Sequence, residues 1–510
     1  MTLRYRIGMV HLDEPPLALD RASSVPLYQQ VREGIARAIR EGKIPPGTRL
    51  PASRELAQRL QVNRTTITTA YDSMAAEGLV RRRVGQGTFV LGGPRRAVPP
   101  SVTWPFSRAV EAVSRQPRPP AALATHPDPV DFASLVPDEE LFPIEPFRKV
   151  MNAVLRRDGK QLLQYGSVSG YTPFRECIAE RLNRRGVAVT VEDVLIVNGS
   201  QQGLDVVFRT LLDPGDMVAV ESPTYSAVLP LLAQYQAQLK PVPMSQKGMD
   251  LNALETALVR RPVKLIYTMP TFQNPTGITM DLDSRRKLLD LTRRYQVPIV
   301  EDDFDPELRF GGKALPPLKA LDEAGLVLYL GTFSKGLFPG LRLGWIVAPP
   351  AVVEALRRTK MFADYHTSAL LQAGVLEFCR RGHYDDHLRR LAGIYREKSQ
   401  HLVRAMSRHF PPEVSWTAPE GGYAFWISLP EGVSAEALLA ESEGQGVLFT
   451  PGNHFFLGGE GERFFRLSIS RVPAHRIEEG VRRLGDIIRN HAASKPAPSR
   501  RQANEPVFQI

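Results

Sequence analysis

The sequence has few cysteines: its 510 residues include two, Cys177 and Cys379. Two thiols exclude a disulfide scaffold and a cysteine-built zinc site, so we expect both to be reduced and to lie in or beside a core. The histidines show no spacing typical of metal ligands, which predicts no metal site. No apolar run reaches the ~20 residues that a membrane-spanning helix needs. The N-terminus has no long apolar region after its charges, which argues against a secretory signal. We therefore expect a cytoplasmic protein with no membrane segment.

The composition is that of a globular protein, with 43% hydrophobic and 23% charged residues, and the length predicts more than one domain. The net charge of +11 is unevenly placed, because residues 21–96 carry 14 Lys and Arg against five Asp and Glu. A compact basic segment beside a nearly neutral body indicates a nucleic-acid-binding module. A solvated basic face is the alternative that composition alone leaves open.

Proline and glycine punctuation divides the chain into five parts. Several prolines interrupt any long element in a linker, although its middle, around residues 108–115, favours a short helix. The expected parts are a leader (1–24), a compact basic unit (25–92), a proline-rich linker (93–128), a large body (129–492) and a disordered tail (493–510).

The basic unit has the pattern of a winged helix-turn-helix. Apolar residues recur at helical spacing over residues 26–40. Ser53 is expected to cap a second helix, and Asn63 a third that ends at Gly78. So short a turn between the second and third helices is typical of helix-turn-helix motifs. Residues 79–91 then predict a two-stranded wing.

The third helix opens with hydrogen-bonding side chains, the kind that recognition helices present to bases and phosphates. Wing arginines would add charge near the phosphates or the minor groove. The stretch from Leu50 to Val90 resembles the DNA-binding domain of the GntR superfamily, and the resemblance covers about residues 25–92. The resemblance implies a double-stranded DNA operator and places Arg54, Arg64, Thr66 and Gly85 at contact positions. The full expected DNA-contact set is Arg54, Arg64, Thr65, Thr66, Thr68, Arg83 and Gly85.

In the large body, short apolar runs alternate with amphipathic helical stretches. Their spacing leaves room for crossover helices, which favours an α/β fold with a largely parallel sheet. The expected strands are Val194–Val197, Met217–Val220, Val263–Thr268, Val297–Val300 and Val327–Leu330.

Polar residues follow these strands where ligands bind in open α/β sheets. Lys335 can form a Schiff base with an aldehyde cofactor. Arg342 and nearby hydroxyls can hold a phosphate, and Gly199-Ser200-Gln201 can form an anion site at a helix N-terminus. Tyr225 offers an aromatic face to a flat ring.

Two further strand ends complete the pattern. The amide of Asn274 can bond a ring hydroxyl, and Asp302 can pair with a pyridinium nitrogen and keep the ring protonated. Asp303 is the alternative ring partner that the residues alone leave open.

In this order and spacing the set resembles the fold-type I pyridoxal phosphate aminotransferases. The resemblance implies pyridoxal 5′-phosphate as cofactor, bound to Lys335 as an aldimine. Asp302, Asn274 and Tyr225 would contact the ring. Arg466 matches the arginine that receives a substrate α-carboxylate, and Tyr165 a tyrosine that reaches the neighbouring subunit's phosphate. The phosphate would be held by Ser200, Gln201, Ser334 and Arg342.

One position departs from that pattern. Related proteins usually place a tyrosine two residues after the ring-pairing aspartate, and its hydroxyl also bonds the ring hydroxyl. Here the residue is Phe304. Loss of that donor should raise the pKa of the bound cofactor's imine and puts efficient transamination in doubt.

The two halves together resemble the MocR subfamily of GntR-type transcriptional regulators. The resemblance implies a multidomain chain: an α+β winged helix-turn-helix, then an α/β fold-type I transferase domain with a mostly parallel sheet and a smaller C-terminal α/β subdomain. It also implies a homodimer that senses pyridoxal phosphate or an amine or amino-acid effector. The alternatives are a working aminotransferase with an appended DNA-binding domain, and a body that serves only as a dimerisation scaffold.

Overall fold

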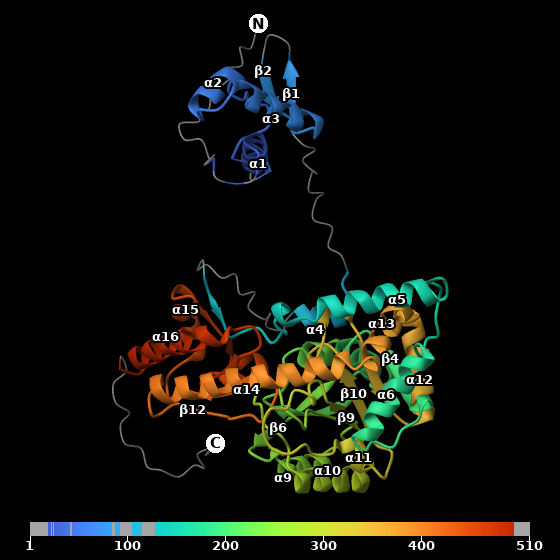
Figure 1. The fold of residues 1–510 in the computed structure, drawn as a ribbon. Helices are drawn as coiled ribbons and strands as arrows, with labels where there is room; N and C mark the ends of the chain where they lie inside the picture. Colours follow the sequence, from blue (N-terminus) through green and yellow to red (C-terminus); the bar gives the residue numbers. More distant parts are fainter. Residues whose placement is uncertain are drawn as a thin grey trace. The chain divides into compact units, whose positions relative to one another are not determined.

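The computed structural model describes residues 19–21, 23, 25–40, 43–83, 87–91, 105–114 and 128–493. The chain divides into two compact units, Met1–Pro105 and Phe106–Ile510, and each is described by itself (Figure 1). Parts of the predicted leader, linker and tail lie outside the described residues, so the fivefold division of the chain stays a prediction.

The small unit is a three-helix core with a two-stranded sheet. Its elements are α1 (Leu27–Arg40), α2 (Ser53–Arg59), α3 (Arg64–Ala76) and the antiparallel pair β1 (Val80–Arg83) and β2 (Gly87–Val90). Residues from all three helices and both strands form one buried apolar cluster, which includes Val31, Leu56 and Ile67. The helix-turn-helix and its wing are therefore confirmed as a fold.

The caps of these helices agree with the sequence in two of three places. The side chain of Asn63 accepts a hydrogen bond from the N–H of Thr65, and Gly78 takes a φ of +72° directly after α3. The prediction that Ser53 caps α2 is wrong: Ala52 holds the N-cap position with extended backbone, and Ser53 is the first helical residue. The Ser53 hydroxyl instead accepts from Nε of Arg64 at 3.5 Å.

The large unit is built around an eight-stranded sheet in the order β4-β11-β10-β9-β8-β5-β6-β7. The run from β10 to β6 is parallel, while β11 is antiparallel to both of its neighbours and β7 to β6. The strands are β4 (Val194–Val197), β5 (Met217–Ser222), β6 (Gln238–Ser245), β7 (Gly248–Met249), β8 (Leu265–Thr268), β9 (Ile299–Asp302), β10 (Val327–Thr332) and β11 (Gly344–Val347).

Helices cover both faces of this sheet. On β10, Leu328 and Leu330 pack into a cluster with α7, α8 and α12, whereas Tyr329 packs on the opposite face with α5, α6 and α13. Further along the second face, α9 and α10 cover β8 and β9 (Figure 1). The helices are α4 (Arg108–Ser114), α5 (Ile144–Leu162), α6 (Thr172–Arg184), α7 (Ser200–Leu211), α8 (Val228–Gln234), α9 (Leu251–Arg260), α10 (Leu282–Tyr295), α11 (Leu318–Leu321), α12 (Pro350–Asp364) and α13 (Ala369–Arg380). Because both faces are buried, the parallel strands read as continuous apolar runs in the sequence.

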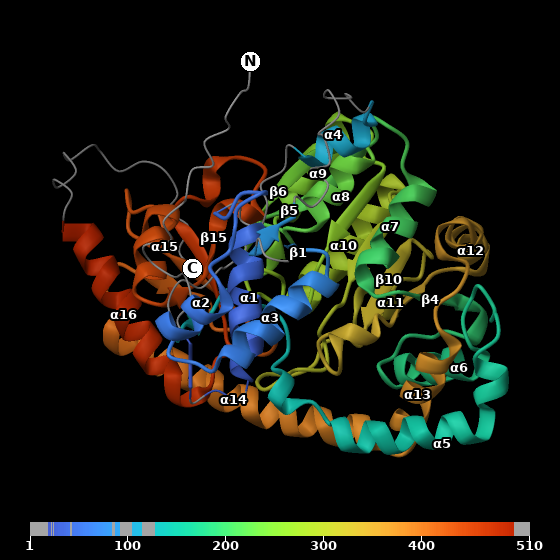
Figure 2. The ribbon, with the colours of Figure 1, turned by 90° about the horizontal axis from the view of Figure 1, so that it is seen from above.

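A smaller subdomain completes the large unit. Its four-stranded antiparallel sheet has the order β12-β13-β16-β15 and shares a core with α14, α15 and α16 (Figure 2). The pair β3 and β14 ties residues 130–131 to this subdomain. The elements are β3 (Val130–Asp131), α14 (His383–His409), β12 (Ser415–Trp416), β13 (Ala424–Ser428), α15 (Ala435–Gly444), β14 (Val447–Leu448), β15 (Thr450–Pro451), β16 (Phe464–Ser468) and α16 (Ala474–Ala493). The predicted fold class is confirmed. No helix within the described ranges is long and apolar enough to cross a bilayer.

Candidate functional site

Lys335 lies half-buried just after β10, at the end of the parallel sheet. Its Nζ donates a hydrogen bond to the carbonyl of Leu135 at 2.6 Å. Burial lowers the pKa of Lys335 to about 8, against the opposing attraction of Asp305 and Asp302. A lysine with such a pKa is partly neutral near pH 8, and the neutral amine is the form that attacks a carbonyl carbon.

Asp302 ends β9 and is also buried. Its Oδ2 accepts from the hydroxyl of Tyr267 at 2.8 Å, whereas Oδ1 is buried without a hydrogen-bond partner among the described residues. Burial raises the pKa of Asp302 to about 6. A buried carboxylate oxygen without a donor is costly unless a ligand supplies one. A protonated ring nitrogen is a donor that fits this position.

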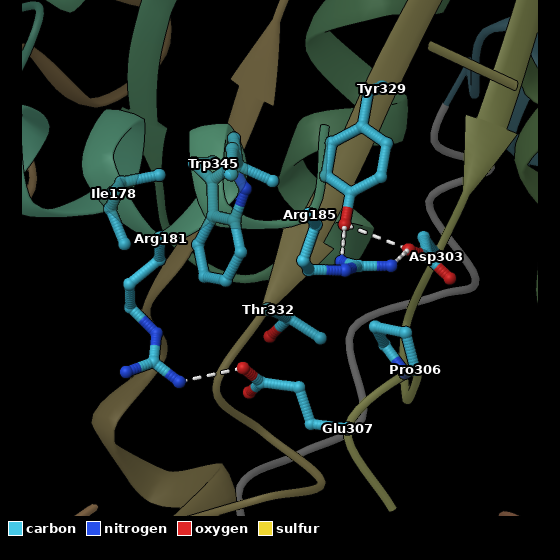
Figure 3. A pocket seen from close by; sticks show the side chains of 10 residues that line it. Ile178, Arg181, Arg185, Asp303, Pro306, Glu307, Tyr329, Thr332 and Trp345 are labelled. Carbon is cyan, nitrogen blue, oxygen red and sulfur yellow. Dashed lines mark hydrogen bonds and ion pairs between the residues drawn. The ribbon is translucent and has the colours of Figure 1, made fainter. Parts of the chain in front are cut away.

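Asp303 points to the other side of the sheet. Its Oδ2 accepts from Nη2 of Arg185 at 2.7 Å and from the hydroxyl of Tyr329 at 2.8 Å. Figure 3 shows these groups around a cavity of about 20 Å³, which has room for a single water. Because neighbouring residues alternate across a strand, Asp303 is engaged away from Lys335. This geometry favours Asp302 over Asp303 as the ring partner.

The turn before α7 and the loop after β10 form what we call the phosphate cup: Gly199, Ser200, Gln201, Ser334 and Arg342. Gly199 has a φ of +80°, and a Cβ built there would lie 2.5 Å from Nη2 of Arg342. That nitrogen donates to the carbonyl of Asn198 at 3.0 Å. Glycine therefore lets the guanidinium approach the N-terminus of α7, where backbone N–H groups and the helix dipole favour an anion.

Two hydroxyl groups fix the loop that brings Ser334 to the cup. The backbone N–H of Ser334 donates to Oγ1 of Thr332 at 3.1 Å, and the two hydroxyl oxygens lie 2.9 Å apart. Thr332 Oγ1 in turn donates to the carbonyl of Leu343 at 3.0 Å. Thr332, which the sequence did not single out, thus fixes the loop that carries Ser334 and Lys335.

Arg466 and Asn274 meet at the opposite side of the site. Nη1 of Arg466 donates to Oδ1 of Asn274 at 2.9 Å, and Nη2 donates to the carbonyl of Ala133 at 2.8 Å. Burial lowers the pKa of Arg466 to about 10, and its Nε has no hydrogen-bond partner in the part of the chain that the structure describes. Asp131 attracts the guanidinium electrostatically, but no carboxylate within the described ranges lies in hydrogen-bond contact with it. A buried guanidinium with no carboxylate in direct contact is suited to receive a ligand's carboxylate.

Tyr225 and Phe304 are the two remaining positions that the sequence connects with a cofactor ring. Tyr225 is half-buried after β5, and burial raises the pKa of its hydroxyl to about 12, so it stays protonated. Phe304 is buried in the apolar cluster that also contains Tyr267 and Val300. As a phenylalanine it has no hydroxyl to donate to a cofactor ring.

Tyr165 lies on the surface with 85% of its area exposed, and its ring meets those of Tyr365 and His366 edge-on. Its predicted contact with a neighbouring subunit's phosphate stays a prediction.

Sequence reasoning missed two groups beside Lys335. Asp305 is fully buried, its Oδ2 has no partner among the described residues, and burial raises its pKa well above the usual range. The hydroxyl of Tyr423 donates to the carbonyl of Lys335 at 2.8 Å. The acid-rich segment Glu301–Asp305 was a visible signal for Asp305, whereas nothing near Tyr423 in the sequence marks it.

The expected DNA-contact residues lie on the helix-turn-helix and its wing. Arg54, Arg64 and Thr65 are exposed, and neither arginine pairs with a carboxylate in the described small unit. Arg83 lies over the ring of Phe89 at 5.4 Å. Thr66 and Thr68 are half-buried, and the hydroxyl of Thr68 donates to the carbonyl of Arg64, while Gly85 lies outside the described residues.

Fold and site together define a winged helix-turn-helix protein with an aminotransferase-type body. A family model described as "Aminotransferase class I and II" matches residues 133–484, and one described as "Bacterial regulatory proteins, gntR family" matches residues 27–90. The chain is 33% identical to the "Probable rhizopine catabolism regulatory protein MocR" of Rhizobium meliloti, over 92% of this chain and 95% of that protein. The chain belongs to the MocR-like regulators, in which a GntR-type helix-turn-helix is fused to a class I and II aminotransferase domain.

The large unit also resembles free-standing enzymes. It is 40% identical to the "2-aminoadipate transaminase" of Thermus thermophilus, over 72% of this chain and 92% of that protein. The structure of LysN, an alpha-aminoadipate aminotransferase from Thermus thermophilus complexed with N-(5'-phosphopyridoxyl)-L-leucine, matches with a TM-score of 0.71 and 38% identity. That match covers 76% of this chain and 98% of LysN.

Proposed function

We propose that this chain is a transcriptional regulator that depends on pyridoxal 5′-phosphate and senses either that cofactor or an amine or amino acid. The observation that carries the proposal is the buried site itself. A lysine with a lowered pKa faces a carboxylate with an unpartnered oxygen, and an arginine-lined cup lies at a helix N-terminus. A body that served only as a dimerisation scaffold would not need this set of groups.

When bound, pyridoxal phosphate supplies an aldehyde carbon and an electron-withdrawing ring. Lys335 would provide the amine that binds the aldehyde. Asp302 would hold a proton at the ring nitrogen, and Tyr267 would hold Asp302 in place through its hydroxyl. Tyr225 would stack on the ring and Asn274 would orient the ring hydroxyl. Ser200, Gln201, Ser334 and Arg342 would hold the phosphate.

Arg466 points to an effector with a carboxylate. Its Nη1 is bonded to Asn274, so a carboxylate bound at Arg466 would also act on the residue that orients the ring. An amine that carries an acidic group would fit, with its nitrogen directed toward Lys335. Such a ligand alters DNA binding only if it favours one geometry of the dimer over another.

The dimer is itself part of the proposal. Large apolar side chains on the ends of α5 and α12 are exposed, including Leu163, Tyr165, Phe362 and Tyr365. Exposed apolar patches of this kind indicate an interaction surface. A second copy of the chain would cover it and bring Tyr165 toward the other site. Two DNA-binding domains would then contact an operator with two half-sites, through the DNA-contact residues predicted above.

The absorption spectrum tests the cofactor assignment. Purified protein is titrated with pyridoxal phosphate, and the visible band of the lysine-bound cofactor is followed. We expect Lys335→Ala to abolish the band without changing the fold, as judged by circular dichroism. Persistence of the same band in Lys335→Ala would refute the assignment of Lys335 as the lysine that binds the cofactor.

A working aminotransferase is the second candidate, favoured by the intact site and by relatives named as aminotransferases at 37% and 40% identity. Phe304 and the DNA-binding domain argue against it. Repeated turnover of an amino acid with a keto-acid acceptor would establish it; a single cofactor-stoichiometric conversion would not.

A further inference from the structure

Asp364, the last residue of α12, accepts hydrogen bonds from three side chains, two at the start of α7 and one on α12 itself. Its carboxylate accepts from Nδ2 of Asn198, from Nε2 of Gln202 at 2.8 Å and from Nζ of Lys360 at 2.7 Å. Charge-assisted hydrogen bonds of this kind are stronger than neutral ones and fix geometry. Asp364 therefore connects the end of α12 to the turn that opens α7.

That turn is part of the phosphate cup. Asn198 directly precedes Gly199, and its carbonyl accepts from Nη2 of Arg342 at 3.0 Å. Its backbone N–H donates to Oε1 of Gln202 at 2.7 Å, so Gln202 bonds both Asn198 and Asp364. The side chain of Asn198 thus faces Asp364 while its carbonyl faces Arg342. A shift of Asp364 would move the backbone that carries the cup.

Lys360 makes the position of Asp364 hard to change. The Lys360 side chain is fully buried, and within the described ranges Asp364 is its carboxylate partner. A buried ammonium needs a nearby carboxylate, and loss of one partner leaves the other charge uncompensated. The carboxylate therefore remains tied to α12 even though it also serves Asn198 and Gln202.

The backbone directly after Asp364 is strained. Tyr365 has φ +66° and ψ −65°, and the N–H of His366 donates to the carbonyl of Asp364 at 2.8 Å. This is a γ-turn of the rare, strained form. Strained backbone persists where the surrounding contacts fix it, and such sites cluster at ligand clamps. The hydrogen bonds of Asp364 lie directly before this strained residue and are among the contacts that can fix it.

We propose that Asp364 is the positioning residue of the phosphate cup: it holds the Asn198–Gly199 turn so that the N-terminus of α7 and Arg342 meet the same phosphate. The inference rests on the proposed binding of pyridoxal phosphate. Asp364 would contact neither the cofactor nor Lys335. It would favour the phosphorylated cofactor indirectly, through its hydrogen bond to Asn198.

The test compares two ligands that differ by the phosphate. Pyridoxal phosphate and pyridoxal are titrated into the full-length wild-type protein, Asp364→Asn and Glu354→Gln, and the visible band is followed. Glu354 is the matched control, because it is also an acid on α12 but pairs with Arg357 and Arg358 at the surface. We expect Asp364→Asn to lower the affinity for pyridoxal phosphate by about tenfold or more and the affinity for pyridoxal by less than about twofold. Glu354→Gln should leave both affinities unchanged.

A second variant guards against misfolding of Asp364→Asn. Gln202→Met removes the hydrogen bonds of Gln202 to Asp364 and to the backbone N–H of Asn198 but keeps the Lys360–Asp364 pair, and it should shift the same affinity ratio in the same direction. Equal losses for the two ligands in both variants, or no loss in either, would overturn the role of Asp364. A wild-type protein that binds neither ligand would instead overturn the proposed function.

Discussion

Replacement of Gly199 by alanine should displace the guanidinium of Arg342 from the phosphate cup. The added Cβ would lie 2.5 Å from Nη2 and 2.8 Å from Cζ of Arg342. Ordinary contact begins near 3.4 Å, so the guanidinium must retreat by about 1 Å. Gly199 also has φ +80° and ψ 168°, a region that only glycine adopts readily and that costs another residue about 1–3 kcal/mol.

The magnitude follows from what Arg342 contributes. Each hydrogen bond to a charged group contributes about 1.5–3 kcal/mol to binding. Displacement of the guanidinium should therefore lower the affinity for pyridoxal phosphate by about 10- to 100-fold. Affinity is measured by titration of the visible band. Gly382→Ala is the matched control, because Gly382 has φ +78° at the N-cap of α14 and a Cβ there would meet nothing within 4 Å.

The control shows the effect of alanine at a positive-φ glycine where the new Cβ meets no neighbour. Both variants should lose thermal stability, but only Gly199→Ala should lose affinity for pyridoxal phosphate. Equal affinities of wild type and Gly199→Ala would refute the cup, because the added methyl group and Arg342 cannot occupy their present positions together.

Three further outcomes follow from the structure. The rate of pyridoxal phosphate binding should rise with pH through a midpoint of about 8, because the pKa of Lys335 is lowered by burial and the neutral amine reacts; a rate independent of pH from 6 to 10 would contradict this. Arg466→Ala should abolish the response of the visible band to amino acids but not to amines without a carboxylate; an unchanged amino-acid response would exclude Arg466 as the carboxylate receptor. Arg64→Ala should weaken operator binding by about tenfold at fixed salt, whereas Arg59→Ala, which removes an arginine paired with Glu55 on α2, should change it little; equal effects in a fluorescence anisotropy assay would contradict the recognition-helix placement.

The sequence predicted the fold well where a strand is buried on both faces. The five expected strands overlap β4, β5, β8, β9 and β10, because continuous apolar runs mark such strands. It did not predict β6, in which polar residues and prolines alternate with apolar ones, nor the strands β7 and β11. The cap of α2 was also missed, because Ser53 and Ala52 are neighbours and only the backbone angles decide which one begins the helix.

The sequence predicted the site residues that lie at strand ends but not the contacts that more distant segments make with them. Lys335, Asp302 and Arg342 follow strands at recognisable spacing. Sequence alternation places Asp302 and Asp303 on opposite faces, yet only the structure shows which face Lys335 shares. The carbonyls of Ala133 and Leu135 contact Arg466 and Lys335 from segments some 200 to 330 residues away in the chain. Backbone contacts of this range leave no signal in side-chain patterns.

The measurement that tests the account most directly is operator affinity with and without pyridoxal phosphate. DNA fragments selected in vitro by the full-length protein are titrated with wild type and with Lys335→Ala. We predict that pyridoxal phosphate, alone or with an amino acid, changes the wild-type affinity by about fivefold or more and leaves that of Lys335→Ala unchanged. Identical affinities of the wild type in all these conditions would contradict a regulator controlled through this site.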